Sequence, residues 1–127
     1  MKVNPFKILR TLQSTSKIIF NDKNKFFSLI DKAGKKSIGL SDFDGIRKEL
    51  NLIFSLCKDY IFGNYRQVSK MSMLKIIGGF LYFLNPVDIV PDFILGIGFL
   101  DDLSVLTYVI KNIRKELDKY ERWKNTR

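Results

Sequence analysis

The chain has 127 residues, a length that favours one domain with its own hydrophobic core. It contains one cysteine, Cys57, and no histidine, so an internal disulfide is excluded and the commonest metal ligand and general base are missing. Zinc sites and serine or cysteine catalytic triads are therefore not favoured, and any catalysis would fall to carboxylates, lysines, tyrosines or a bound metal.

The net charge of +9 is unevenly distributed along the chain. Residues 1–36 carry nine Lys or Arg against two Asp, and residues 103–127 carry seven against three acidic residues. Residues 71–102 carry one Lys against four Asp, so two basic ends flank an acidic and apolar middle. This layout favours contact with a polyanion, either anionic lipid or nucleic acid, although a solvated basic surface has the same pattern.

Residues 3–20 predict one basic amphipathic helix. Its apolar side chains fall near one helical face, namely Phe6, Leu9, Leu12, Ile19 and Phe20, and the basic Lys7, Arg10 and Lys17 lie largely opposite. The segment lacks the unbroken apolar core of a secretory signal. Such a helix either packs on the rest of a bundle or lies on a membrane surface.

A turn-like break at residues 21–24 precedes a short predicted helix around residues 26–30. Residues 32–39 predict a loop, because glycine and clustered like charges oppose a helix. Ser41 is a good N-cap for the next helix, which we expect to run to about residue 62 and to end at Gly63 and Asn64. Cys57 lies on its apolar stripe and is interpreted as a buried small hydrophobe.

Residues 68–84 predict another helix with Gly78 and Gly79 in its middle. Each glycine costs about 1 kcal/mol relative to alanine, so we expect another backbone to approach closely there. A final helix, capped by Asp101 or Asp102, repeats apolar residues every three or four positions. The fold class is therefore predicted to be all-α, a compact bundle of about four to six helices around a proline-broken helical hairpin. It divides into a basic N-terminal helical segment, 1–40, and a helical core, 41–127, within one domain.

Residues 76–100 are almost wholly apolar and long enough to span a bilayer. However, Asp88 and Asp92 would each cost roughly 2.5–3.5 kcal/mol near the midplane, and an interior proline adds about 3 kcal/mol. We therefore expect the chain to reverse at Pro86 and Pro91. The resulting hairpin either is buried as protein core or dips into a membrane from one side.

The aspartates of this region, together with Asn85, have three possible roles: capping of a turn or helix, cation binding and ion pairing. Asn85, Asp88, Asp92 and Asp101 stand where a side chain can cap a turn or a helix start. Alternatively Asp88, Asp92, Asp101 and Asp102 converge, and then bind Mg²⁺ or Ca²⁺ or pair with Arg66 or Lys75. The residues alone leave these readings open.

The same stretch resembles a known family signature. The sequence 82–94 is YFLNPVDIVPDFI, and the sequence 98–103 is GFLDDL. Together they resemble the YkvA-like domain of unknown function, a small helical family widespread in bacteria, over about residues 60–110. The resemblance marks Pro86, Asp88, Pro91, Asp92, Asp101 and Asp102 as signature positions, and it implies membrane association and no agreed enzymatic activity.

We therefore expect a non-enzymatic helical module associated with a membrane through its apolar hairpin and basic ends. The residues expected to contact a membrane or another polyanion are Lys2, Lys7, Arg10, Lys17, Lys35 and Lys36. We expect it to be cytoplasmic and peripheral on the inner face of the cell membrane, with no cofactor unless the aspartates bind Mg²⁺ or Ca²⁺. The alternatives are a soluble protein–protein interaction module and a metal-dependent hydrolase that uses the aspartates. Nucleic acid is not favoured, because the aromatic residues fall on apolar stripes and not among the basic clusters, and no small-molecule substrate is indicated.

Overall fold

The computed structural model describes residues 5–84 and 102–126, with the backbone alone at Asp42, Asp102 and Leu103. These residues form six α-helices, one short 3-10 helix (η1) and no strand. The elements are α1 (Pro5–Thr11), α2 (Gln13–Phe20), α3 (Lys23–Ser37), η1 (Ser41–Ile46), α4 (Arg47–Ile61), α5 (Lys70–Leu84) and α8 (Asp102–Asn125). The predicted all-α class is confirmed, and the predicted hairpin at Pro86 and Pro91 lies outside the described residues.

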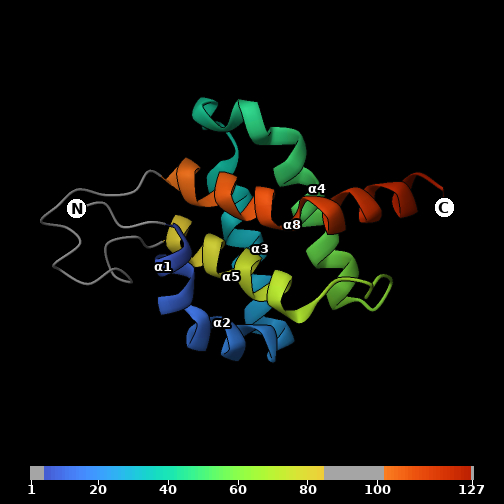
Figure 1. Ribbon diagram of the computed structural model, residues 1–127, viewed down its shortest axis with the longest axis horizontal. Helices are drawn as coiled ribbons and strands as arrows, with labels where there is room; N and C mark the ends of the chain where they lie inside the picture. Colours follow the sequence, from blue (N-terminus) through green and yellow to red (C-terminus); the bar gives the residue numbers. More distant parts are fainter. Residues whose placement is uncertain (1–4, 85–101, 127) are drawn as a thin grey trace, which may run out of the picture.

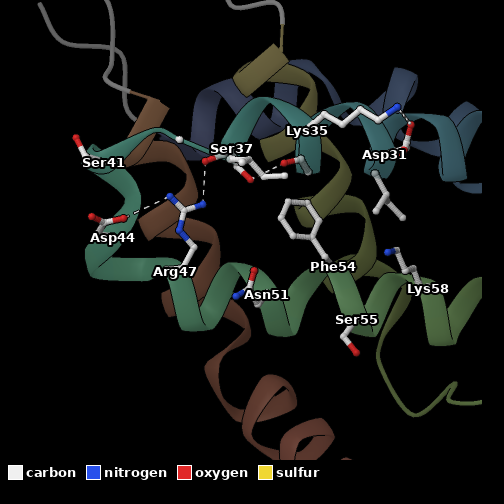
Figure 2. Close-up of a pocket in the computed structure, with 14 residues that line it drawn as sticks. Asp31, Lys35, Ser37, Ser41, Asp44, Arg47, Asn51, Phe54, Ser55 and Lys58 are labelled. Carbon is white, nitrogen blue, oxygen red and sulfur yellow. Dashed lines mark hydrogen bonds and ion pairs between the residues drawn. The ribbon is translucent and has the colours of Figure 1, made fainter.

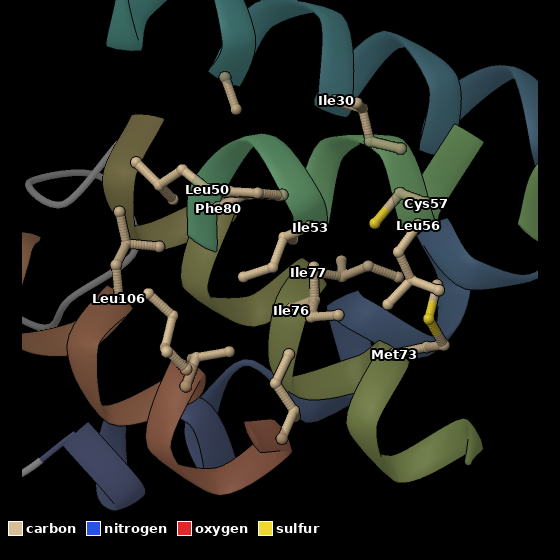
Figure 3. Packing of buried hydrophobic residues seen from close by; sticks show 14 of the residues in the cluster. Ile30, Leu50, Ile53, Leu56, Cys57, Met73, Ile76, Ile77, Phe80 and Leu106 are labelled. Atoms are coloured by element: carbon tan, nitrogen blue, oxygen red, sulfur yellow. The ribbon is translucent and has the colours of Figure 1, made fainter. Parts of the chain in front are cut away.

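Helix α5 lies at the centre of the fold and contacts α1, α2, α3 and α8 (Figure 1). It is apolar on nearly every side, which is typical of a helix surrounded by others. Ile77 and Phe80 are almost completely buried, and Figure 3 shows them among side chains of α4 and α8. Phe80 also stacks on Phe54 of α4, with ring centroids 5.1 Å apart. The hydrophobic core is therefore organised around α5.

Gly78 and Gly79 let the neighbouring helices approach α5 from two sides. A β-carbon at Gly78 would lie 3.0 Å from Leu9 Cδ2, 4.0 Å from Leu9 Cα and 3.4 Å from Ser16 Oγ. A β-carbon at Gly79 would lie 3.2 Å from Val109 Cγ2. The predicted approach of another backbone is found at Gly78, where a backbone atom of α1 lies within 4.0 Å, whereas the nearest atoms at Gly79 belong to side chains of α8.

Both ends of α5 are held by residues distant in sequence. At the start, the Ser69 hydroxyl accepts a hydrogen bond from the Ser72 backbone N–H at 3.1 Å, and Glu116 of α8 accepts from the Ser69 N–H at 2.6 Å and from the Ser72 hydroxyl. At the end, the Lys36 ammonium donates to the Phe83 carbonyl at 2.6 Å. A carboxylate at the helix start and a cation at its end both complement the helix dipole.

The N-terminal helix predicted over residues 3–20 is in fact two helices that meet at Leu12. The Thr11 hydroxyl donates to the Lys7 carbonyl at 2.9 Å, a contact that often bends helices, and Leu12 has a ψ of 0°. The change of direction alters which residues are buried. Phe6, predicted on the apolar face of the helix, is 52 % exposed, and Ser16 is fully buried.

Helix α3 is longer than predicted. The expected loop at residues 32–39 is wrong, because the helix continues to Ser37 and the turn comes at Gly39, whose φ is +86°. Ala33 is fully buried and Ser37 nearly so, and this packing offsets the cost of Gly34. Lys35 and Lys36 lie in the last turn, where cations are favourable.

The start of the next helix also differs from the prediction. Ser41 is not an N-cap but the first residue of η1, and α4 begins six residues later at Arg47. The Arg47 guanidinium donates to the Ser37 carbonyl at 2.8 Å and the Leu40 carbonyl at 2.9 Å, so it ties the start of α4 to the end of α3 and to the residue before η1. The predicted end is confirmed, since α4 ends at Ile61 and Gly63 has a φ of +80°.

Candidate functional site

The predicted acidic site lies almost wholly outside the described residues. Asn85, Pro86, Asp88, Pro91, Asp92 and Asp101 are not described, and at Asp102 only the backbone is, where α8 begins. In the described part of the chain, no three His, Cys, Asp or Glu side chains are grouped so that they could hold a metal ion. Capping, cation binding and the hydrolase alternative that depends on it therefore stay predictions.

Arg66 and Lys75, suggested as ion-pair partners for the aspartates, both contact other residues in the structure. The Arg66 guanidinium lies over the Tyr60 ring, 4.8 Å from its centroid. The Lys75 ammonium donates to Asn112 Oδ1 of α8 at 3.2 Å. Lys75 thus belongs to a site formed by α5 and α8.

The basic residues expected to contact a polyanion lie, where they are described, on α1, α2 and α3. Lys2 is outside the described residues, and Lys7, Arg10 and Lys17 are exposed on α1 and α2. Lys35 forms an exposed ion pair with Asp31 at 3.1 Å. Lys36 binds the end of α5 and lies over the Phe83 ring, 4.7 Å from its centroid. Lys36 therefore has a structural role that its sequence position did not indicate.

An apolar pocket of about 220 Å³ opens between α1, α5 and α8, and we call it the α1–α5 pocket. Its walls are largely apolar or aromatic, and its two charged lining residues are both cations, Arg10 and Lys75. The full lining consists of Phe6, Leu9, Arg10, Gln13, Met71, Leu74, Lys75 and Tyr108. Phe6 is 52 % exposed and Met71 is 50 % exposed, so large apolar side chains are open to solvent beside the two cations.

Only part of this pocket could be inferred from the sequence. Met71 and Lys75 are one helical turn apart on α5, so their proximity can be inferred from the sequence. Arg10 was expected on the basic side of the N-terminal helix and Phe6 on its apolar side, so their place beside the same pocket was not foreseen. No periodicity in the sequence indicates on which side of α5 the helix α1 packs.

A second, larger groove of about 890 Å³ runs between α3 and α4 (Figure 2). Its lining carries both signs of charge, including Asp31, Asp44, Arg47 and Lys58. Figure 2 shows the Phe54 ring projecting into the groove from α4. Ile38, at its edge, is 77 % exposed. A groove with mixed charges and an apolar base suits a polypeptide better than a lipid.

A chain of hydrogen bonds joins α4 to α8 beside this groove. The Lys124 ammonium donates to the Ser55 hydroxyl, which is 2.6 Å from the Tyr120 hydroxyl, and Tyr120 in turn donates to Asp59. Tyr120 is fully buried, and Figure 2 shows the Ser55 hydroxyl pointing away from the groove. These residues form a polar connection between the two helices.

Cys57 is completely buried in the core, as predicted. Desolvation by burial raises the pKa of its thiol far above the ordinary value. The thiolate is the reactive form of cysteine, so this side chain is chemically inert in the folded protein.

The fold and the α1–α5 pocket define a small all-α protein with a basic, amphiphilic surface. A family model described as "Protein of unknown function (DUF1232)" matches residues 72–108, which run from α5 into α8. The chain is also 32 % identical over 102 residues to the "Uncharacterized membrane protein YkvA" of Bacillus subtilis (strain 168), an alignment that covers 80 % of this chain and 96 % of the relative. The chain therefore belongs to the YkvA-like family of unknown function, and the resemblance inferred from its signature is confirmed. No solved structure matches it.

Proposed function

We propose that the protein is a non-enzymatic module that binds peripherally to anionic membrane, on the cytoplasmic face of the cell membrane. The observation that carries this proposal is the α1–α5 pocket, where the exposed Phe6 and Met71 flank Arg10 and Lys75. Apolar side chains beside cations suit the boundary between headgroups and acyl chains. The relative from Bacillus subtilis is named a membrane protein, which agrees with this reading. None of the helices in residues 5–84 and 102–126 is long and apolar enough to cross a membrane.

We expect each contact with the membrane to contribute little binding free energy, and we expect the affinity to depend on the salt concentration. Burying a side chain such as Phe6 completely stabilises by about 1.5–3 kcal/mol, so the half-exposed Phe6 and Met71 would each contribute roughly 1 kcal/mol. Each Lys or Arg near an anionic leaflet contributes about 1 kcal/mol, and this attraction falls off within a Debye length. Lys7 and Lys17, exposed on the same two N-terminal helices, add to the attraction. We therefore expect reversible binding at low salt that high salt removes.

Vesicle flotation tests the proposal directly. The full chain is mixed with neutral phosphatidylcholine vesicles, or with vesicles that also contain phosphatidylglycerol, at low and high salt. We expect flotation only with the anionic vesicles at low salt. The double variant Arg10→Glu with Lys75→Glu should lose binding, and Phe6→Ser with Met71→Ser should weaken it without changing the net charge.

The matched control changes the same net charge elsewhere. Lys58 on α4 and Lys119 on α8 are both exposed, and neither lines the α1–α5 pocket. The double variant Lys58→Glu with Lys119→Glu should therefore retain more binding than Arg10→Glu with Lys75→Glu. Equal loss in the two variants would mean that total charge governs binding, and the pocket surface would then have no special role.

A second candidate function is protein binding at the groove between α3 and α4. The observation that favours it is the size of the groove together with its mixed charges and the exposed Ile38. A photo-crosslinking amino acid at Asn51, an exposed residue that lines the groove, should give one discrete adduct in cells. The same group at Lys111, exposed on α8 and outside the groove, is the control. Identical adduct patterns at both positions would count against a specific partner.

A further inference from the structure

We propose that the α1–α5 pocket takes up a segment of one acyl chain of an anionic phospholipid, while Arg10 and Lys75 bind the phosphate of the same lipid. The inference rests on the proposed membrane function and names the ligand of its contact surface. The pocket would then hold the protein to an individual lipid, in addition to the attraction of the surface as a whole.

The size and lining of the pocket suit a chain segment. Pockets for small molecules usually measure about 300–1,000 Å³. The present 220 Å³ is smaller, and corresponds to the space of about seven waters at roughly 30 Å³ each. Leu9, Leu74 and Tyr108 supply a wall from each of three helices. These walls offer few hydrogen-bonding partners, so replacing water by methylene groups is favourable.

The open side of the pocket carries unbalanced positive charge. Among the described residues, neither Arg10 nor Lys75 forms an ion pair with a carboxylate. Lys75 is positioned by Asn112, whose amide oxygen accepts from the ammonium at 3.2 Å. The amide nitrogen of Asn112 is in turn fixed by donating to the Tyr108 carbonyl at 2.9 Å. A phosphate can therefore meet a positioned ammonium and a guanidinium beside the same apolar cavity, which is the charge complement of an anionic lipid.

The methionines give a site-specific test of this ligand. Met71 lines the pocket, whereas Met73, two residues further on, is completely buried in the core. We would label the methionine methyl groups of the full chain with ¹³C and titrate decyl phosphate as monomer, below its micelle concentration. The Met71 methyl resonance should shift and saturate while Met73 stays constant. Inorganic phosphate and the neutral octyl glucoside should each produce a much smaller shift at the same concentration.

Variants that remove a lining cation, and a variant that fills the pocket, test where decyl phosphate binds. Arg10→Gln or Lys75→Gln should each weaken decyl phosphate binding about tenfold, because each removes a charge-assisted hydrogen bond. Gln13 is a half-buried polar residue of the lining, so the larger side chain of Gln13→Trp should fill the pocket. Lys111→Gln, which removes a cation on α8 outside the lining, should leave the affinity unchanged.

The outcomes separate this inference from the membrane function. Flotation with anionic vesicles but no response of Met71 to decyl phosphate would overturn the acyl-chain site and leave peripheral binding intact. Joint, unsaturable shifts of Met71 and Met73 would indicate general detergent action and would also overturn it, as would undiminished binding by Gln13→Trp. Saturable binding of decyl phosphate without flotation would support the pocket's ligand and contradict the membrane function.

Discussion

Among the described glycines, Gly78 is the one at which an added β-carbon would lie nearest to another atom. Replacing it by alanine should gain about 1 kcal/mol in helix propensity. The added methyl group, however, would lie 3.0 Å from Leu9 Cδ2 and 3.4 Å from the buried Ser16 hydroxyl, and overpacking of this kind typically costs about 1–3 kcal/mol. We expect Gly78→Ala to lower the free energy of unfolding by about 1 kcal/mol, measured by urea denaturation followed by circular dichroism.

Gly34 in α3 provides the matched control for Gly78. A methyl group there would have no other atom within 4 Å. Gly34→Ala should therefore stabilise the protein by about 0.4–1 kcal/mol, through helix propensity and the lower entropy of the unfolded chain. If both substitutions stabilise equally, α1 and α2 do not press on Gly78 as described.

At the scale of single residues, the sequence predicted the features that depend on a residue's own size and polarity. The burial of Cys57 follows from the apolar stripe, and the close approach of α1 at Gly78 follows from the cost of glycine in a helix. The roles of Lys36 and Glu116 could not be predicted, because their partners lie 47 and 44 residues away. Proximity over such separations is decided by the packing of whole helices.

At the scale of elements, α5 depends on charged groups supplied by other helices. Glu116 accepts hydrogen bonds from the Ser69 N–H and the Ser72 hydroxyl, so it neutralises the positive end of the α5 dipole. Hydrogen bonds to charged groups contribute about 1.5–3 kcal/mol. Glu116→Gln keeps the shape of the side chain and removes its charge, and should lower the free energy of unfolding by about 1–2 kcal/mol in urea denaturation.

A second glutamate of α8 gives the comparison for Glu116. Glu121 pairs with Lys48 at 3.4 Å, and the Lys48 side chain is 75 % exposed. Surface ion pairs of this type contribute about 0–1 kcal/mol. Glu121→Gln should therefore have less than half the effect of Glu116→Gln. A larger effect for Glu121→Gln would show that the capping of α5 contributes little to stability.

Helical periodicity predicted α4, α5 and α8 well because each carries an apolar stripe over several turns. Periodicity predicted helix boundaries wrongly where packing against other helices decides where a helix begins or ends. Gly34 and the cluster of lysines suggested a loop, yet the buried Ala33 and Ser37 keep α3 helical. Leu12 continued the apolar stripe in sequence, yet a hydrogen bond from Thr11 accompanies a break there. The pocket beside α1 is lined by residues of four helices, and the sequence did not reveal how these helices pack together.

At the scale of the whole molecule, the basic segment 1–40 is packed into the core. Helices α1, α2 and α3 all contact α5, which belongs to the segment 41–127 (Figure 1). Phe26, Ile30 and Ala33 of α3 belong to the same buried cluster as Ile77 and Phe80. Removing residues 1–40 would expose one side of the most apolar helix in the described structure, and so would remove part of the burial that stabilises the fold.

We therefore expect residues 41–127 alone not to fold cooperatively. Urea denaturation of this fragment should show no sigmoidal transition in the far-ultraviolet signal, and the fragment should bind a dye that recognises exposed apolar surface. Adding a separate peptide of residues 1–40 should restore the transition, because the missing interface is mainly apolar burial. A cooperative transition of the fragment alone, as steep as that of the full chain, would instead make residues 1–40 an appendage. The α1–α5 pocket would then be a junction between a self-folding core and a segment packed on it, because Arg10 belongs to that segment and Lys75 to the core.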